Sequence, residues 1–285
     1  MKSLPRWFRK DIPDITLIKE RLNLFKDLDL HTVCASAHCP NMGECFSKGT
    51  ATFMILGDIC TRNCRFCAVS KGNPLPLDFN EPENIAQAIK NLNLDYAVIT
   101  SVTRDDLSDG GALQYYKAID EIRKVNPETK IEILIPDFQG QQESIEVVVN
   151  AHPDVIGHNV ETVPRLYKKV SPQADYELSL GVLKKIKEKN NFIFTKSTIL
   201  LGLGETKQEI IQTMKDLNNV GCDMLAIGQY LSPSQDHLGV QRYFSPDEFG
   251  EFQDIGSSLG FKSVASGPFV RSSYNASEEL SGCTM

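Results

Sequence analysis

Six of the eight cysteines in this chain of 285 residues fall between positions 34 and 67. Three of them, Cys60, Cys64 and Cys67, are spaced C-x3-C-x2-C directly after an apolar run, so that one loop carries three thiols. Three thiolates this close together can hold three corners of a cubane iron–sulfur cluster and leave the fourth iron open to another ligand. A structural zinc ion needs a fourth protein ligand, and this loop has no histidine to supply it. The spacing therefore favours an iron–sulfur cluster.

A second triplet, Cys34, Cys39 and Cys45, precedes the first with the spacing C-x4-C-x5-C. Its chemistry stays open on spacing alone. A zinc knuckle could be completed by His31 or His38, since both lie within the same segment. The alternative is a second iron–sulfur cluster, with the histidines as ordinary loop residues.

The composition limits the class of protein and its compartment. The net charge is −7, which argues against a general nucleic-acid binder, because such proteins carry a basic surface. No apolar run approaches the ~20 residues of a membrane span. The first fourteen residues, MKSLPRWFRKDIPD, lack the apolar core of a secretory signal. We therefore expect a cytoplasmic protein whose cysteines do not form disulfides. Of the remaining cysteines, Cys222 lies in an apolar run typical of a core, and Cys283 lies near the C-terminus.

Strand-like and helix-like segments alternate from residue 51 onward. The expected strands are apolar runs rich in Val, Ile and Leu, at 51–57, 95–100, 130–135, 154–160, 192–201, 223–228 and 261–266. The expected helices are amphipathic stretches, at 82–93, 111–125, 141–151, 175–189, 206–219 and 246–259. Pro82 and Pro246 are typical of a first helical turn. Before residue 51, only 15–28 shows a helical pattern, and the rest reads as an irregular extension.

About six βα units in series predict a parallel sheet covered by helices. Both an open doubly wound sheet and a full or partial barrel fit this alternation. No G-x-G-x-x-G follows an early strand, so the dinucleotide-binding fold lacks its fingerprint. In a barrel the chemistry lies at the carboxyl ends of the strands. Polar residues gather where three expected strands end, at 100–106, 158–161 and 202–205.

The motif C-x3-C-x-aromatic-C after a first strand resembles the radical S-adenosylmethionine (SAM) enzymes. The resemblance implies a 4Fe–4S cluster whose open iron is chelated by the amino and carboxylate groups of SAM. It also implies reductive cleavage of SAM to methionine and a 5′-deoxyadenosyl radical that abstracts hydrogen from an unreactive carbon. By the same resemblance, Phe66 packs beside the adenine of SAM.

The two triplets together resemble the lipoyl synthase family. Further segments of the chain match that family in order, over residues 7–276; they are 101–112, 157–167, 197–205, 228–240 and 267–276. The resemblance implies a partial parallel (βα)6-type TIM barrel at 51–266. An N-terminal cysteine-rich extension at 1–50 and a C-terminal tail at 267–285, which crosses the mouth of the barrel, complete the expected architecture.

The same resemblance assigns Cys34, Cys39 and Cys45 to an auxiliary 4Fe–4S cluster. Its fourth ligand is a serine of the R-S-S-Y motif at 271–274, and Ser273 is the matching residue. A hard alkoxide among soft thiolates is unusual, and it suits an iron that must be released.

The implied activity is that of a radical SAM sulfurtransferase. Two sulfur atoms, taken from the auxiliary cluster, are inserted at C6 and C8 of an octanoyl chain. That chain is amide-linked to a lysine of a lipoyl carrier protein, either an E2 subunit or the glycine-cleavage H protein. A reducing electron donor and an iron–sulfur carrier are further implied partners, whereas nucleic acid and membrane are not.

Polar residues at the strand ends are weaker candidates for SAM or substrate binding. Asn159 and Glu161 could hydrogen-bond the ribose or amino group of SAM, or they could form a helix N-cap followed by a first-turn acid. Arg104, Asp105 and Asp106 would by themselves suggest a solvated turn, and the resemblance makes them candidates for SAM or substrate.

Gly202, Gly204 and Arg165 also allow both a functional and a structural interpretation. Gly202 and Gly204 allow close approach of backbone to a ligand, and they also suit an ordinary loop. Arg165 could pair with the SAM carboxylate or form a surface ion pair. We expect no catalytic role for His237, since this radical chemistry needs no imidazole base.

Two other functions compete with this interpretation. The first is sulfur insertion of the biotin synthase kind, which is disfavoured because that family lacks the upstream cysteine triplet and the R-S-S-Y tail. The second is a zinc-stabilised module that binds protein or RNA. Bound iron and sulfide, as opposed to zinc without sulfide, would distinguish the enzymes from the module.

Overall fold

A curved, mostly parallel sheet forms the centre of the computed structural model, which describes residues 4–9, 14–37, 39–47 and 50–283. The parallel strands are β2 (Thr52–Ile55), β5 (Tyr96–Ser101), β6 (Lys130–Leu134), β7 (Val155–Gly157), β8 (Phe194–Leu201), β9 (Met224–Gln229) and β10 (Ser263–Gly267). A short strand β1 (His31–Thr32) pairs antiparallel with β2 at one edge.

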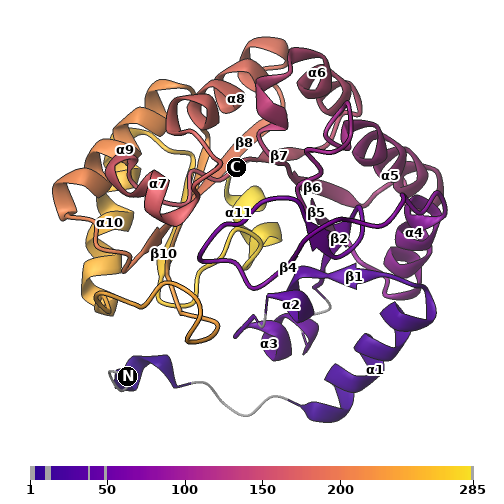
Figure 1. The fold of residues 1–285 in the computed structure, drawn as a ribbon, viewed down its shortest axis with the longest axis horizontal. Coiled ribbons are helices and arrows are strands. Elements are labelled where there is room, and N and C mark those ends of the chain that lie inside the picture. Colours follow the sequence, from indigo (N-terminus) through magenta and orange to yellow (C-terminus); the bar gives the residue numbers. More distant parts are fainter. Residues whose placement is uncertain (1–3, 10–13, 38, 48–49, 284–285) are drawn as a thin grey trace.

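Six helices connect these strands and cover the outside of the sheet (Figure 1). They are α4 (Glu81–Asn91), α5 (Ala112–Val125), α6 (Gln142–Asn150), α8 (Tyr176–Lys189), α9 (Lys207–Asn219) and α10 (Pro246–Leu259). Local sequence fixes where several begin. Capping boxes start α9 at Thr206 and α10 at Ser245, and prolines occupy the first turns of α4 and α10. The predicted alternation of strands and helices is confirmed.

The strands stand in the sheet in their order along the chain, which distinguishes a barrel from a doubly wound sheet. A doubly wound sheet reverses its strand order at a switch point and carries helices on both faces. Here all six connecting helices lie on the outer face, so the fold is a partial TIM barrel (Figure 1). Within the described chain, β2 and β10 do not pair with each other, and the barrel is open between them.

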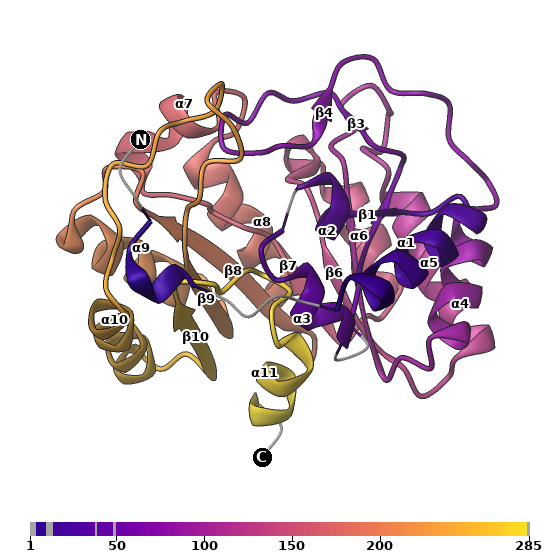
Figure 2. The same ribbon diagram turned by 90° about the horizontal axis from the view of Figure 1, so that it is seen from below.

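Several short elements connect or cover the barrel. A small two-stranded sheet, β3 (Ile59–Cys60) with β4 (Ser70–Lys71), lies over its mouth, at the carboxyl ends of the strands (Figure 2). The chain between β6 and α8 includes η2 (Phe138–Gly140), η3 (Pro164–Leu166) and α7 (Tyr167–Val170).

The N-terminal extension packs on the β2 edge of the barrel. It contains η1 (Arg6–Phe8), α1 (Ile15–Asp27), α2 (Val33–Ser36) and α3 (Met42–Ser47). Phe25 of α1 makes edge-on ring contacts with Phe46 of α3 and Phe53 of β2, and all three rings are buried. This aromatic contact fixes the extension to the sheet.

The C-terminal tail leaves β10 and ends in α11 (Ala276–Cys283). Residues 271–274 lie at the mouth, but α11 lies at the opposite end of the barrel from β3 and β4 (Figure 2). Among the described residues, no helix combines the length and the apolar character that crossing a membrane requires.

Candidate functional site

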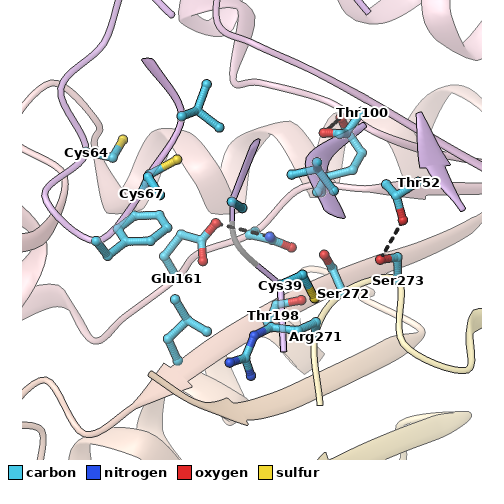
Figure 3. A pocket seen from close by; sticks show the side chains of 18 of the residues that line it. Cys39, Thr52, Cys64, Cys67, Thr100, Glu161, Thr198, Arg271, Ser272 and Ser273 are labelled. Carbon is cyan, nitrogen blue, oxygen red and sulfur yellow. Dashed lines mark hydrogen bonds between the residues drawn. The ribbon is translucent and has the colours of Figure 1, made fainter. Parts of the chain in front are cut away.

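A pocket of about 550 Å³ opens at the mouth of the barrel, where the carboxyl ends of the strands meet. All six clustered cysteines line it, together with Ser272 and Ser273 of the tail. Figure 3 shows Cys64 and Cys67 on one side of this pocket and Cys39 with Ser272 and Ser273 on another, with Glu161 between the two groups. The fold therefore brings both thiol triplets to one cavity.

The C-x3-C-x2-C loop follows β2 and presents partly exposed, unpaired thiols to this pocket. Backbone amides of Arg62 and Thr103 donate to Cys60 Sγ at 3.4 and 3.3 Å. Burial raises the pKa of the Cys64 thiol, and it raises the pKa of Cys67 to about 11. A bound metal centre would instead lower the pKa of these thiols, because coordination to a metal deprotonates a thiol.

Arg62, which stands between two cysteines of the loop, is a residue that sequence reasoning missed. Its guanidinium donates to both oxygens of Asp137 at 2.6 Å and to Asp105 at 2.7 and 2.9 Å. Burial would raise the pKa of Asp137, but Arg62 outweighs this effect and the net shift is downward. The bidentate pair ties the cysteine loop to the segments that follow β5 and β6. An arginine enclosed by the cysteines was the available signal.

The second triplet comes from the N-terminal extension. Cys34 lies on α2, Cys45 lies on α3, and Cys39 lies between the two helices, with its amide donating to the carbonyl of Cys34 at 3.0 Å. Burial raises the pKa of the Cys34 thiol to about 11. Ser273 faces the same part of the pocket, and Thr52 Oγ1 donates to its Oγ at 2.9 Å.

Two further hydrogen bonds lock the tail to the extension. Tyr274 OH donates to Glu44 Oε1 at 2.7 Å, and Asn41 Nδ2 donates to the carbonyl of Phe269 at 2.7 Å. Asn41 and Glu44 both lie between Cys39 and Cys45 in the sequence. These contacts join residues more than 220 positions apart in the sequence. They bring the segment that contains Ser273 to the segment that contains the second triplet.

Glu161 and Asn159 follow β7 and line the pocket. Glu161 has a left-handed backbone, with φ of 61°, which is rare for a residue with a side chain and is found where function constrains the chain. Burial raises the pKa of its carboxyl to about 7, and a 3.1 Å hydrogen bond from Asn159 Nδ2 opposes that rise. Burial thus favours the protonated form of this carboxyl, and a cationic or hydrogen-bond-donating group bound beside it would favour the ionised form.

The pocket wall holds buried polar atoms that have no hydrogen-bond partner within the described part of the chain. Six of them belong to residues lining the pocket; they are Ser101 Oγ, His158 Nε2, Asn159 Oδ1, Thr162 Oγ1, Thr198 Oγ1 and Tyr230 OH. Each such group costs about 1–3 kcal/mol if left unsatisfied. A polar ligand of the size of SAM would supply partners, so the wall fits such a molecule.

Phe66 also lines the pocket. The remaining predicted site residues lie outside the pocket lining; they are Arg104, Asp105, Asp106, Arg165, Gly202 and Gly204. The guanidinium of Arg104 is buried against Asp106, at 2.8 to 3.2 Å, and against the carbonyl of Leu56. Arg165 is exposed, where it pairs with Glu209 at 2.6 Å and donates to the carbonyl of Gly204 at 2.9 Å.

The two glycines after β8 differ in surroundings. Gly202 has φ of +102°, and a Cβ there would meet Nε2 of Gln229 and the carbonyl of Arg242. Gly204 has φ of +116°, and a Cβ there would lie at ordinary contact distance, 3.7 Å, from Cγ of Gln241. His237 Nε2 lies 3.1 Å from the carbonyl oxygen of Cys67, so this histidine supports the cysteine loop from outside.

The donor set fits two iron–sulfur clusters. Each triplet presents three thiols to the pocket, and the second has a serine hydroxyl at hand. Over the residues that the structure describes, no three His, Cys, Asp or Glu side chains converge tightly enough to hold a single metal ion. His31 lies in β1, and His38, the other candidate for completing a zinc site, lies outside the described residues.

Comparisons with known proteins show the family and the fold of this chain. The family model of the radical SAM superfamily matches residues 54–217. A solved structure of HydG, a maturase of the FeFe-hydrogenase, is similar over 96% of this chain and 61% of its own, with a TM-score of 0.61 at 13% identity. Methylornithine synthase (PylB) is similar over 90% and 79%, with a TM-score of 0.53 at 13% identity. At such low identity these two structures show the fold alone.

The barrel, the cysteine loop and the family match define a radical SAM enzyme. Lipoyl synthase of Caldicellulosiruptor saccharolyticus is 56% identical over 274 residues, which cover 96% of either chain. Lipoyl synthase of Caldanaerobacter subterraneus subsp. tengcongensis is 55% identical over 281 residues and 97% of either chain. The chain belongs to the lipoyl synthase family, and the cofactors of that family are SAM and 4Fe–4S clusters.

Proposed function

We propose that this enzyme inserts two sulfur atoms, at C6 and C8, into an octanoyl group carried on a lysine of a lipoyl carrier protein. One observation carries the proposal: a single pocket is lined by two cysteine triplets, one of which has a serine beside it. Sulfur insertion needs a hydrogen-abstracting centre and a sulfur source on either side of the same carbon. A shared cavity supports that geometry, because reaction requires near-contact of the reacting atoms.

On the radical side, Cys60, Cys64 and Cys67 would hold a 4Fe–4S cluster through their thiolates. When bound, this cluster and SAM supply the hydrogen-abstracting radical, and the second cluster supplies sulfur. Phe66 would pack beside the adenine, and Asn159 and Glu161 would bind the ribose or amino group of SAM. The high pKa and strained backbone of Glu161 support a binding role for its carboxyl.

On the sulfur side, Cys34, Cys39, Cys45 and Ser273 would hold the auxiliary cluster. The hydrogen bond that Thr52 donates to Ser273 Oγ supports this role, because it keeps the hydroxyl oxygen fixed in the pocket. The pocket is also lined by apolar side chains, among them Met54, Val102, Leu134, Ile135 and Leu200. Such a wall excludes water and suits an alkyl chain.

The remaining candidates would act from outside the pocket. Arg165 would join the loops that follow β7 and β8 through its contact with Gly204, and Gly202 would allow the close packing of that loop against Gln229. Arg104, Asp105 and Asp106 would hold the segment after β5, with Asp105 acting through Arg62.

We also propose a division of the chain by task. Residues 1–50 would carry auxiliary cluster ligands, residues 51–266 would form the radical SAM barrel, and residues 267–285 would bring the R-S-S-Y motif to the site. The acyl carrier would be an E2 subunit or the glycine-cleavage H protein, with a reducing electron donor and an iron–sulfur carrier as further partners. Thiols that serve as cluster ligands suit a reducing compartment, so we place the enzyme in the cytoplasm.

The proposal is tested with anaerobically reconstituted enzyme, SAM, dithionite and a peptide that carries N6-octanoyl-lysine. We expect lipoyl peptide, two equivalents of 5′-deoxyadenosine per lipoyl group, and about eight iron and eight sulfide per chain. A peptide with an unmodified lysine is the control. Zinc without sulfide, or SAM cleavage that never yields lipoyl peptide, would contradict the proposal.

A further inference from the structure

A buried charge cluster at the closed end of the barrel has no part in the chemistry described above. Lys196 on β8, Glu132 on β6 and Glu279 on α11 are 1%, 1% and 8% exposed. Lys196 Nζ lies 2.8 Å from Glu279 Oε2 and 3.5 Å from Glu132 Oε1. Tyr96 OH, from β5, donates to Glu132 Oε2 at 2.6 Å. We call these four residues the floor cluster.

Helix α11 contacts the floor cluster at the amino-terminal end of the barrel. Ala276 and Leu280 of α11 are buried against Tyr96, Val155 and Met224. These three residues begin β5, β7 and β9, so the helix packs where the strands start. In Figure 1 the helix lies at the centre of the ring of strands, and in Figure 2 it lies opposite the mouth.

Helix α11 is bound to the barrel by an ion pair as well as by apolar contacts. Lysine inside a sheet is costly unless a carboxylate pairs with it, and removing one partner of a buried pair leaves an uncompensated charge. Glu279 is the nearer partner of Lys196, and it is the member of the floor cluster that the tail supplies. Burial raises the pKa of Glu279 to about 7, and the charge of Lys196 opposes that rise. The charge of Lys196 therefore stabilises the ionised form of Glu279, with which it pairs.

Anchoring α11 restricts the residues just before it. Two residues separate Ser273 from the first residue of the helix, so Ser273 lies within about 10 Å of chain from that point. On its other side the carbonyl of Val270 lies against Gly228 of β9, where a Cβ would not fit. The R-S-S-Y motif is thus held between a close backbone contact and the anchored helix.

We propose that Lys196 is a positioning residue: through Glu279 it anchors α11 in the barrel floor and so fixes Ser273 beside the second cysteine triplet. This inference rests on the proposed role of Ser273 as a cluster ligand. The floor cluster then links the closed end of the barrel to the assembly of the site at its mouth.

The test compares Lys196→Met and Glu279→Gln with Glu278→Gln, a matched control at an exposed position of the same helix. Hydrogen exchange of the 270–283 segment is measured in cluster-free and reconstituted protein. Both floor variants are expected to lose tail protection, whereas the control retains it. Glu279→Gln nearly preserves shape, so it keeps the test valid if Lys196→Met does not fold.

Cluster content and activity complete the test. In the floor variants we expect iron to fall from about eight toward about four per chain. Lipoyl formation should fall about tenfold or more while 5′-deoxyadenosine is still produced. A tail that stays protected in both variants overturns the inference, and so does a released tail with full iron and unchanged lipoyl formation.

Ser273→Ala, measured alongside, separates this inference from the proposed function. Its floor cluster is intact, so its tail should stay protected while the auxiliary cluster is lost. Full iron content in Ser273→Ala would show that the ligand assignment has failed, whereas the exchange rates of the floor variants still report on the anchor itself.

Discussion

The six clustered cysteines are chemically alike, and in the proposed function their tasks differ through the group that completes each set. The loop of Cys60, Cys64 and Cys67 contains no fourth cysteine or histidine, so in the proposed function one iron of its cluster would stay open to SAM. Around Cys34, Cys39 and Cys45 the tail brings Ser273, whose oxygen is a harder ligand than a thiolate. A weakly held iron suits a cluster that must give up sulfur.

Alanine at one cysteine of each triplet should separate radical formation from sulfur transfer. Cys64→Ala should abolish reductive SAM cleavage, because three thiolates are the minimum set for the radical-generating cluster. Cys39→Ala should still produce 5′-deoxyadenosine but form no lipoyl product. The measurement is chromatography of both products from one anaerobic reaction.

Either of two results would contradict these assignments. One is 5′-deoxyadenosine from Cys64→Ala at the normal yield, and the other is normal lipoyl formation by Cys39→Ala. Cys222→Ala is the control, because that thiol is buried away from the pocket and hydrogen-bonds the carbonyl of Met224.

Exchange of the oxygen ligand for sulfur at Ser273 should hold the auxiliary iron more firmly. Ser273→Cys is expected to keep iron near the wild-type content and yet form less lipoyl product, since a softer thiolate releases iron less readily. Ser273→Ala is expected to lose iron. Iron and sulfide analysis with product chromatography tests both, and unchanged turnover in Ser273→Cys would rule out release of this bond as a requirement.

At the scale of elements, the cysteine loop is held by contacts with several others. Arg62 binds the segments after β5 and β6, the amide of Arg65 donates to the carbonyl of Val170 at the end of α7, and His237 reaches the carbonyl of Cys67. A cluster loop held in this way keeps its thiols in place before any metal binds.

Arg62→Lys should impair the loop although the charge is kept. A lysine cannot make the paired hydrogen bonds to Asp105 and Asp137 that the planar guanidinium makes. We expect SAM cleavage to fall about 10- to 100-fold, as for other residues that support metal ligands. The rate of 5′-deoxyadenosine formation measures this effect. Arg65→Lys is the matched control, and equal losses in the two variants would argue against a specific role for Arg62.

At the scale of the whole molecule, the candidate site and the buried ion pairs lie at opposite ends of the barrel. The pocket occupies the mouth, whereas the floor cluster and a second ion cluster lie where the strands begin. In that second cluster, Asp223 pairs with Lys187 at 2.9 Å and Lys262 at 2.8 Å, and it accepts from the amide of Thr195. Such separation is typical of TIM barrels.

Asp223→Asn should lower the free energy of unfolding by about 3 kcal/mol at pH 7, near the lower end for a broken buried pair because Lys262 is half exposed. Burial would raise the pKa of Asp223, but the lysines and Thr195 outweigh it and the net shift is downward. The folded pKa therefore lies below the unfolded value of 3.8, so the contribution is present above that value.

Urea denaturation of the cluster-free wild type and Asp223→Asn checks this prediction from pH 7 downward. The difference between the two proteins should shrink as the pH falls through the folded pKa, below 3.8. Asp247→Asn, at an exposed first-turn position of α10, is the control. A difference that is independent of pH would contradict the electrostatic explanation.

Much of this protein follows from local sequence. The C-x3-C-x2-C spacing places three thiols on one loop, because a loop of eight residues cannot spread them far. The βα alternation and the prolines of α4 and α10 predicted the order of the elements and most of the helix bounds to within two residues, although β7 ends at Gly157, three residues before the expected end. These features depend on neighbours along the chain, so spacing and periodicity are enough to predict them. The roles of the individual SAM-contacting residues stay predictions.

Only the tertiary structure decided which distant residues meet. Nothing local to Arg62 indicates that Asp137 is its partner, and nothing in the tail indicates that Glu279 reaches Lys196 inside the barrel. The meeting of Ser273 with Thr52 likewise joins two residues that lie 221 positions apart in the sequence. Such contacts follow from how the whole sheet curves and packs, because a side chain's partner is set by position in space and sequence spacing alone does not encode it.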